Sequence, residues 1–108
     1  MDETKRQSHS SPSLENIQSL LRTHLPEIQE RYDVAFLGIF GSYVKGRQKR
    51  RSDLDVLVEF GSRKPTLFEF IGLEIYLSEL LGIKVDLVMK NVLKPHIGRH
   101  ILSEVLAV

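Results

Sequence analysis

The sequence contains no cysteine. The chain can therefore form neither a disulfide framework nor a cysteine-based zinc site. It also lacks any apolar run that approaches the roughly 20 residues needed to span a membrane. Its first thirteen residues, MDETKRQSHSSPS, contain no apolar core of a secretory signal. We therefore expect a small cytoplasmic protein.

An excess of charge of one sign is missing as well. Fifteen Lys and Arg residues face 14 Asp and Glu residues, which gives a formal net charge of +1 over 108 residues. This balance does not favour direct binding to nucleic acid. Five cations nevertheless gather between Lys45 and Arg51. We interpret this segment first as a solvated loop, with contacts to an acidic partner or to RNA as the alternatives.

The chain is long enough for one domain. Residues 1–12 are polar and predict a disordered tail, and residues 13–108 form the folded domain. Ser11-Pro12-Ser13 predicts a helix start with a capping serine and proline in the first turn. Apolar residues then recur every three or four positions as far as Tyr32, which is typical of an amphipathic helix. Pro26 predicts a kink or a restart within it.

Apolar runs and turn residues predict the remaining elements. The predicted strands cover residues 34–40, 53–60 and 83–89. A short helical turn ends at Gly46, and longer helices cover 66–81 and 94–106, with residues 105–108 extended as an alternative. This order predicts an α+β fold in which helices cover a small mixed sheet. Antiparallel and parallel pairing of the first two strands both remain open, because no full crossover helix joins them.

The predicted helix 66–81 has more apolar residues than one face can use. One stripe should cover the sheet, while Phe68, Ile71 and Ile75 form a second stripe on roughly the opposite side. A protein partner is one explanation for this second stripe. Coverage by the C-terminal helix is the other.

Two carboxylates mark the start of the second predicted strand. Asp53 and Asp55 should project to the same side, about 7 Å apart, because side chains alternate along a strand. Like charges this close remain ionised only when cations lie between them, and Mg²⁺ prefers such oxygen ligands. Asp86 would complete a cluster of three if the third strand lies beside the second.

Gly41-Ser42 lies where the first strand turns into a helical segment. Glycine lets the backbone approach a ligand closely, and the free N–H groups of such a turn favour an anion. The Ser42 hydroxyl can donate to a phosphate oxygen, and Lys45 could reach the same anion. An anion cradle facing a dicarboxylate suits Mg-ATP, with two metal ions aligning an in-line displacement at phosphorus.

The stretch GSYVKGRQKRRSDLDVLV resembles the signature of the minimal nucleotidyltransferases, the small branch of the DNA-polymerase-β-like superfamily. The matching positions are Gly41, Ser42, Lys45, Gly46, Ser52, Asp53, Asp55 and, in VDLV, Asp86. Two positions depart from the family pattern, since Lys45 replaces the usual arginine and Val44 the usual alanine. Lysine keeps the charge but loses the planar fork of arginine.

Small members of this family resemble the antitoxin half of HEPN–MNT toxin–antitoxin pairs. The resemblance implies a polymerase-β-like fold and transfer of AMP from Mg-ATP to a tyrosine of a HEPN ribonuclease, which silences it. It also implies that Asp53, Asp55 and Asp86 hold metal, that Asp86 helps to activate the attacking hydroxyl, and that Gly41, Ser42, Lys45 and Ser52 bind the nucleotide. The toxin would dock on the second apolar stripe or on the Lys45–Arg51 loop.

Other interpretations remain open. The chain could neutralise its partner by binding alone, transfer the nucleotide to a small molecule such as an aminoglycoside, or regulate RNA through the Lys45–Arg51 segment. His96 and His100 have a spacing that can bind zinc, but we expect them to be exposed surface residues. Tyr43 could stack on the base, although ordinary packing is the favoured interpretation.

Overall fold

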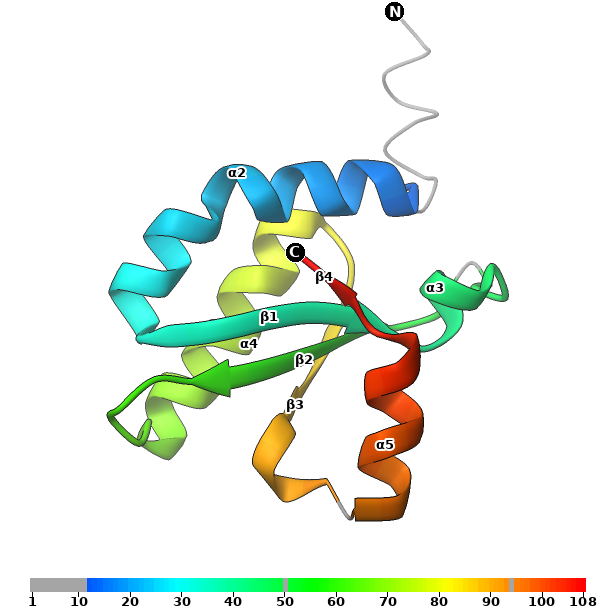
Figure 1. Cartoon of the computed structure of the whole chain (residues 1–108). Helices are drawn as coiled ribbons and strands as arrows, with labels where there is room; N and C mark the ends of the chain where they lie inside the picture. The colour runs from blue at the N-terminus through cyan, green and yellow to red at the C-terminus, as the bar shows by residue number, and fades with distance from the viewer. Residues whose placement is uncertain (1–11, 50, 94) are drawn as a thin grey trace, which may run out of the picture.

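The computed structural model describes residues 12–49, 51–93 and 95–108, which form a four-stranded sheet with helices packed around it (Figure 1). The elements, in chain order, are α2 (Leu14–Tyr32), β1 (Val34–Phe40), α3 (Ser42–Lys45), β2 (Leu54–Phe60), α4 (Leu67–Leu81), β3 (Val85–Met89), a 3-10 helix η1 (Lys90–Val92), α5 (Pro95–Glu104) and β4 (Leu106–Ala107). The predicted disordered tail, apart from Pro12, lies outside the described residues, as do Arg50 and Lys94.

The sheet is mixed, as predicted, with the strand order β3-β2-β1-β4. β1 pairs with β2 in the antiparallel sense, which decides the pairing that the sequence left open. β2 pairs with β3 in the parallel sense, and the short β4 pairs antiparallel with β1. The second and third strands are therefore neighbours, which is the condition for Asp86 to join Asp55.

The hydrophobic core lies between one face of the sheet and the helices α2 and α4. Buried side chains from these two helices and from β1, β2 and β3 form a single cluster. On the opposite face, a Cβ atom at Gly38 would lie 2.6 Å from Cγ2 of Val105, so the chain that follows α5 packs directly on this glycine. α4 and α5 therefore lie on different sides of the sheet, and Figure 1 shows them well apart.

The first helix begins at Leu14, directly after the predicted start Ser11-Pro12-Ser13, of which Ser11 lies outside the described residues. Pro12 therefore precedes the helix and does not lie in its first turn as predicted. Ser13 is the N-cap, and its hydroxyl accepts a hydrogen bond of 3.1 Å from the backbone N–H of Asn16. The helix continues through Pro26 without a restart. Its axis bends between the blue and cyan parts in Figure 1, in agreement with the expected kink.

The caps predicted for α4 are confirmed. Thr66 and Glu69 form a reciprocal capping box, with bonds of 3.1 and 2.8 Å, and Gly82 ends the helix with a φ of 72°. The predicted second stripe is exposed: Phe68 retains 86% of its accessible surface, Ile71 41% and Ile75 52%. Coverage of this stripe by the C-terminal helix was thus the wrong alternative, because α5 approaches the other side of the sheet.

Several predicted elements extend beyond the observed ends. β2 begins at Leu54 and β3 at Val85, rather than at residues 53 and 83. α5 ends at Glu104, because Leu106 and Ala107 pair with Ile39 and Gly38 as β4, which confirms the extended alternative. Over the described part of the chain, every helix is too short or too polar to traverse a lipid bilayer.

Tyr43 packs into the core, as the favoured interpretation held. Its side chain is 2% exposed, and its hydroxyl has no hydrogen-bond partner among the described residues. His96 and His100 are exposed, as expected. Nε2 of His100 lies 3.4 Å from a carboxylate oxygen of Glu104 on the next turn of α5.

Candidate active site

The turn after β1 has a backbone conformation that only glycine adopts readily. Gly41 has φ 83° and ψ −150°, a region that costs other residues about 1–3 kcal/mol. The N–H groups of Val44 and Lys45 both donate to the Gly41 carbonyl at 3.1 Å, which closes the single turn of α3. No side chain caps this turn, so its first N–H groups have no partner within the helix. They are available to an anion.

The antiparallel pairing of β1 with β2 brings this turn against the first carboxylate of β2. Phe40, the residue before Gly41, is the register partner of Asp55. A Cβ atom at position 41 would collide with the carboxylate of Asp55. The missing side chain of Gly41 is therefore what allows the turn and the carboxylate to approach each other.

Asp86 joins Asp55 from the neighbouring strand. The two residues are direct register partners in the parallel pair β2–β3, where neighbouring strands lie about 4.8 Å apart. Their side chains therefore share the face of the sheet opposite the α2–α4 core. Asp53 lies just before β2, and one of its oxygens is 4.0 Å from Nζ of the exposed Lys84.

The electrostatics of Asp55 agree with mutual repulsion among these carboxylates. Partial burial is the main cause that raises the pKa of the Asp55 carboxyl above its usual range, and the negative charges of Asp86 and Asp53 raise it further. A cation placed among the three carboxylates would relieve this repulsion. A positive charge near these carboxylates would therefore stabilise the ionised form of Asp55.

The donor set fits Mg²⁺ in its chemistry, because this ion prefers carboxylate oxygens and completes its shell with waters and substrate phosphates. Within the residues that the structure describes, however, no three acidic or histidine side chains are placed to hold one metal ion by themselves. The arrangement therefore suits an ion held by one or two of the carboxylates together with a phosphate. A closed protein cage of three aspartates is not present among these residues.

Lys45 and Ser52, the remaining predicted nucleotide ligands, already have partners within the chain. Nζ of Lys45 is 3.3 Å from the Glu104 carboxylate at the end of α5. The Ser52 hydroxyl accepts a 2.7 Å bond from the backbone N–H of Lys49 and so helps to shape the basic loop. Glu104 did not figure in the sequence predictions, because nothing in its local pattern indicates a contact with a residue 59 positions earlier.

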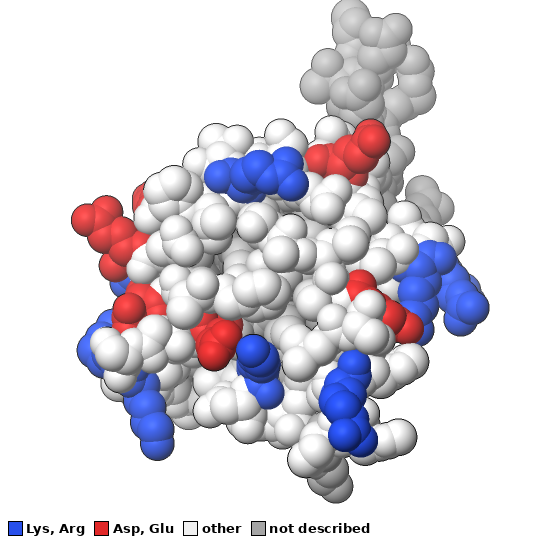
Figure 2. All heavy atoms as spheres, in the orientation of Figure 1, with Lys and Arg blue, Asp and Glu red and all other residues white. Residues whose placement is uncertain are grey.

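On the face drawn in Figure 2, the charges of the described residues do not form one continuous basic region. Figure 2 shows acidic and basic side chains interspersed over the visible face. Arg47, Lys49 and Arg51 are exposed, in agreement with a solvated loop.

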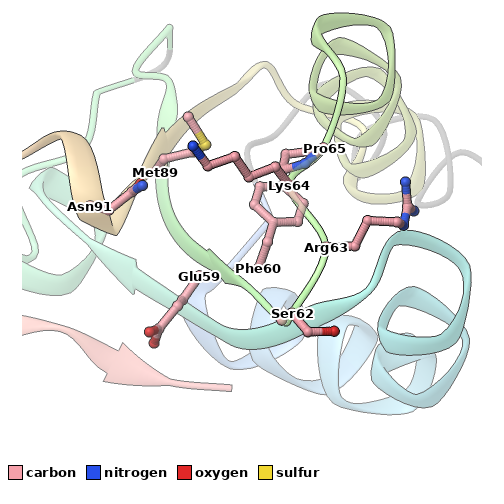
Figure 3. A pocket seen from close by; sticks show the side chains of 9 residues that line it. Glu59, Phe60, Ser62, Arg63, Lys64, Pro65, Met89 and Asn91 are labelled. Carbon is pink, nitrogen blue, oxygen red and sulfur yellow. The ribbon is translucent and has the colours of Figure 1, made fainter.

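A hollow of about 500 Å³ lies at the other end of β2. It is bounded by the loop after β2 and by Met89 and Asn91 (Figure 3). Asp55 and Phe60 are five residues apart along β2, so this hollow is about 17 Å from the carboxylates. Its lining mixes apolar side chains, such as Phe60 and Met89, with charged ones, and Arg63 among them is paired with Glu69 at 2.9 Å. The hollow is therefore separate from the acidic site.

Comparison with known proteins gives a family match for most of this chain. Residues 21–108 match the family model described as nucleotidyltransferase domain. The protein adenylyltransferase MntA of Thermococcus cleftensis is 50% identical over 96 residues, which cover 89% of this chain and 96% of that protein.

Solved structures extend the comparison to the fold. A structure assigned to the minimal nucleotidyltransferases superposes with a TM-score of 0.78 at 30% identity, covering 92% of this chain and 99% of the other. A toxin–antitoxin structure with AMP-PNP superposes with a TM-score of 0.62 at 25% identity, covering 84% of this chain and 68% of the other. The predicted nucleotidyltransferase fold is thereby confirmed.

Proposed function

This chain belongs to the nucleotidyltransferase domain family, and from that membership we propose that it is a protein adenylyltransferase that acts as an antitoxin in the cytoplasm. It transfers AMP from Mg-ATP to a hydroxyl, that of a tyrosine, on a partner HEPN ribonuclease. The 50% identity to a protein adenylyltransferase over most of the chain supports the reaction class. The likeness to a toxin–antitoxin structure with AMP-PNP supports the nucleotide and the partner class.

The observation that carries this proposal is the position of Asp55. It is in register with Asp86 on one side, and on the other side its carboxylate lies against the backbone of Gly41. A triphosphate bound at the Gly41-Ser42 turn would thus lie next to a pair of carboxylates. In this arrangement the open N–H groups of the turn and the Ser42 hydroxyl hold phosphate oxygens.

Asp53, Asp55 and Asp86 supply the oxygens for divalent cations, with the triphosphate completing the coordination. When bound, Mg²⁺ neutralises charge on the phosphates and favours in-line displacement at the α-phosphorus. The pairwise rather than threefold grouping of the carboxylates agrees with a site that is complete only when the nucleotide is present. We propose that two Mg²⁺ ions bind here, as is common in phosphoryl-transfer sites.

The chemical step is a substitution at the α-phosphorus. The acceptor hydroxyl oxygen forms a bond to this phosphorus, and the bond between the α-phosphorus and the oxygen that bridges to the β-phosphate breaks. Pyrophosphate leaves with that bonding pair, and the hydroxyl proton passes to the Asp86 carboxylate. Asp86 suits this role because it is exposed and can reach an incoming acceptor.

The acceptor protein requires a docking surface near this site. The exposed stripe of Phe68, Ile71 and Ile75 is the surface we assign to the toxin, with the Lys45–Arg51 loop as the alternative. An apolar surface of this kind is typical of a protein interface. Direct binding of nucleic acid is not part of the proposal.

The proposal is tested by the position of the label that reaches the partner. The chain is incubated with Mg²⁺, a HEPN ribonuclease and ATP labelled at the α- or the γ-phosphate. We expect label on the ribonuclease from the α position only, at a tyrosine identified by peptide mass spectrometry, together with loss of ribonuclease activity. Tight binding without transfer of either label would favour an antitoxin that acts by docking alone.

The matched variants are Asp55→Asn and Glu59→Gln. Both replace a carboxylate of β2 by its amide, but Glu59 lies four residues farther along the strand. We expect Asp55→Asn to reduce transfer at least 100-fold and Glu59→Gln to leave it within twofold. Equal activity of the two variants would contradict the site assignment.

A further inference from the structure

The strand that carries Asp86 lies at the edge of the sheet formed by residues 12–49, 51–93 and 95–108. Within these residues the order β3-β2-β1-β4 leaves β3 paired with β2 alone. The backbone N–H of Leu54 donates to the Lys84 carbonyl at 2.9 Å, so the alternation along β3 turns the N–H groups of Val85 and Leu87 away from β2. These two residues flank Asp86.

Two side chains of α4 accept hydrogen bonds from these outward N–H groups. The N–H of Leu87 donates to Oε2 of Glu74 at 2.9 Å, and the N–H of Val85 donates to the Ser78 hydroxyl at 3.0 Å. The Ser78 hydroxyl in turn donates to the Glu74 carbonyl at 2.9 Å. All three bonds are partly buried, where a lost partner costs more than it does at the surface.

The spacing of the two elements explains why the pairs match. Four residues of an α-helix rise about 6 Å, and two residues of a strand advance about 6.6 Å. Glu74 and Ser78 are four residues apart, and Val85 and Leu87 are two apart. One turn of α4 therefore presents its two acceptors at the distance at which β3 presents its two donors.

We propose that Glu74 and Ser78 are positioning residues for nucleotidyl transfer, because together they fix the edge strand on both sides of Asp86. This inference rests on the proposed function, in which Asp86 receives the proton of the acceptor hydroxyl. Neither Glu74 nor Ser78 touches the nucleotide, since both bind the outer edge of β3. Their contribution is to hold Asp86 opposite Asp55, and a displacement of about 1 Å in such a group can cost 100-fold in rate.

The test compares Glu74→Met with Glu74→Gln in the full chain, with a HEPN ribonuclease as acceptor. Methionine keeps the length of the side chain and removes the acceptor, whereas glutamine retains an oxygen that can accept from Leu87. We expect Glu74→Met to lower kcat at least tenfold while the KM for ATP changes less than threefold. Glu74→Gln should restore kcat to within threefold of the wild type.

The control is Glu30→Met, which makes the same replacement at an exposed position of α2, outside the assigned docking stripe, and should leave kcat and KM unchanged. Amide hydrogen exchange supplies a readout that does not depend on activity. The Leu87 amide should exchange at least tenfold faster in Glu74→Met, and Ser78→Ala should do the same to the Val85 amide.

The outcomes separate this inference from the proposed function. A wild-type chain that transfers no AMP overturns the proposed function and, with it, the positioning role. Transfer by the wild type with an unchanged kcat in folded Glu74→Met overturns the positioning role alone. A lower kcat in both Glu74→Met and Glu74→Gln, with native amide exchange in the latter, would also overturn it, because the carboxylate charge would then matter rather than the bond to β3.

Discussion

The carboxylate of Asp55 occupies the space that a side chain at Gly41 would need. The backbone of Gly41 and the carboxylate of Asp55 are thereby held in contact, although the two residues are 14 positions apart in the chain. This contact links an expected anion site to an expected cation site, and most consequences for activity follow from it.

Replacement of Gly41 by alanine should therefore affect both stability and activity. We expect Gly41→Ala to lower the free energy of unfolding by roughly 2–3 kcal/mol, from the unfavourable φ of 83° and the collision with Asp55. Gly46→Ala is the control, since Gly46 also has a positive φ, 69°, but faces open space. It should cost only about 1 kcal/mol. Denaturant unfolding measures both values, and equal losses would contradict the close approach.

Asp55→Asn should make the folded chain more stable at neutral pH. The pKa of the Asp55 carboxyl is raised in the folded state, chiefly by burial, so its ionisation opposes folding. The free energy of unfolding of the wild type should consequently fall as the pH rises from below the ordinary value of 3.8 through the raised pKa. The asparagine variant should lack this fall, so that the two proteins converge in acid.

Unfolding curves measured between pH 3 and pH 8 test this expectation, with Glu59→Gln as the control. Addition of Mg²⁺ together with ATP should narrow the gap at pH 7, because the occupied site stabilises the protein that retains the carboxylate more than it stabilises the variant. A less stable Asp55→Asn at pH 7 would show that the carboxylate has a structural role.

Glu104→Gln should strengthen the binding of ATP. The Glu104 carboxylate lies 3.3 Å from Nζ of Lys45. If Lys45 binds the triphosphate as proposed, Glu104 competes with the triphosphate for this charge. We expect the KM for ATP to fall about threefold, while the free energy of unfolding changes by less than about 1 kcal/mol, as is usual for a partly exposed pair. Steady-state transfer assays give the KM, with Glu79→Gln as the control. A rise in KM would mean that Glu104 orients Lys45 rather than competing for it.

Tyr43→Phe should stabilise the chain. The Tyr43 hydroxyl is buried and has no hydrogen-bond partner in the part of the chain that the structure describes, and such a group costs roughly 1–3 kcal/mol of desolvation. Phenylalanine removes that group and keeps the ring in the core, so we expect a gain of about 1 kcal/mol in the free energy of unfolding. An unchanged or lower value in thermal or denaturant unfolding would indicate that the hydroxyl is satisfied in solution.

The exposed stripe on α4 should contribute to binding of the toxin. The double substitution Phe68→Ser with Ile75→Ser should raise the Kd for a HEPN ribonuclease at least tenfold, because such apolar anchors contribute about 1–2 kcal/mol each. Val92→Ser is the control, since Val92 is an exposed apolar residue as well, at 60%, but lies in η1 and not on the stripe. Calorimetric titration measures the Kd. If only charge reversal at Arg47 and Lys49 weakened binding, the basic loop would be the docking surface instead.

Local signals allowed much of the fold to be predicted. The bounds of β1 were predicted correctly, because a continuous apolar run ends at a glycine. The caps of α4 followed from Thr66 and Gly82, whose chemistry acts within four residues. The proximity of Asp86 to Asp55 could be stated only as a condition, since it depends on which strands become neighbours.

The features that escaped prediction depend on contacts between distant residues. Glu104 pairs with Lys45, and Glu74 accepts from Leu87, but neither residue has a distinctive local pattern. Asp53 was predicted to lie within β2 but precedes it, because the register of β2 with β3 begins at Leu54. Periodicity and capping rules cannot supply such information, since it arises only when the helices pack on the sheet.

The acceptors that α4 places along β3 also limit how this protein can associate. An incoming strand that paired along that edge would need hydrogen bonds from the N–H groups of Val85 and Leu87. These groups already donate to Ser78 and Glu74, respectively. Growth of the sheet into amyloid-like stacks is therefore disfavoured on this side. A partner protein that arrives here must be recognised through side chains, not through shared backbone ladders.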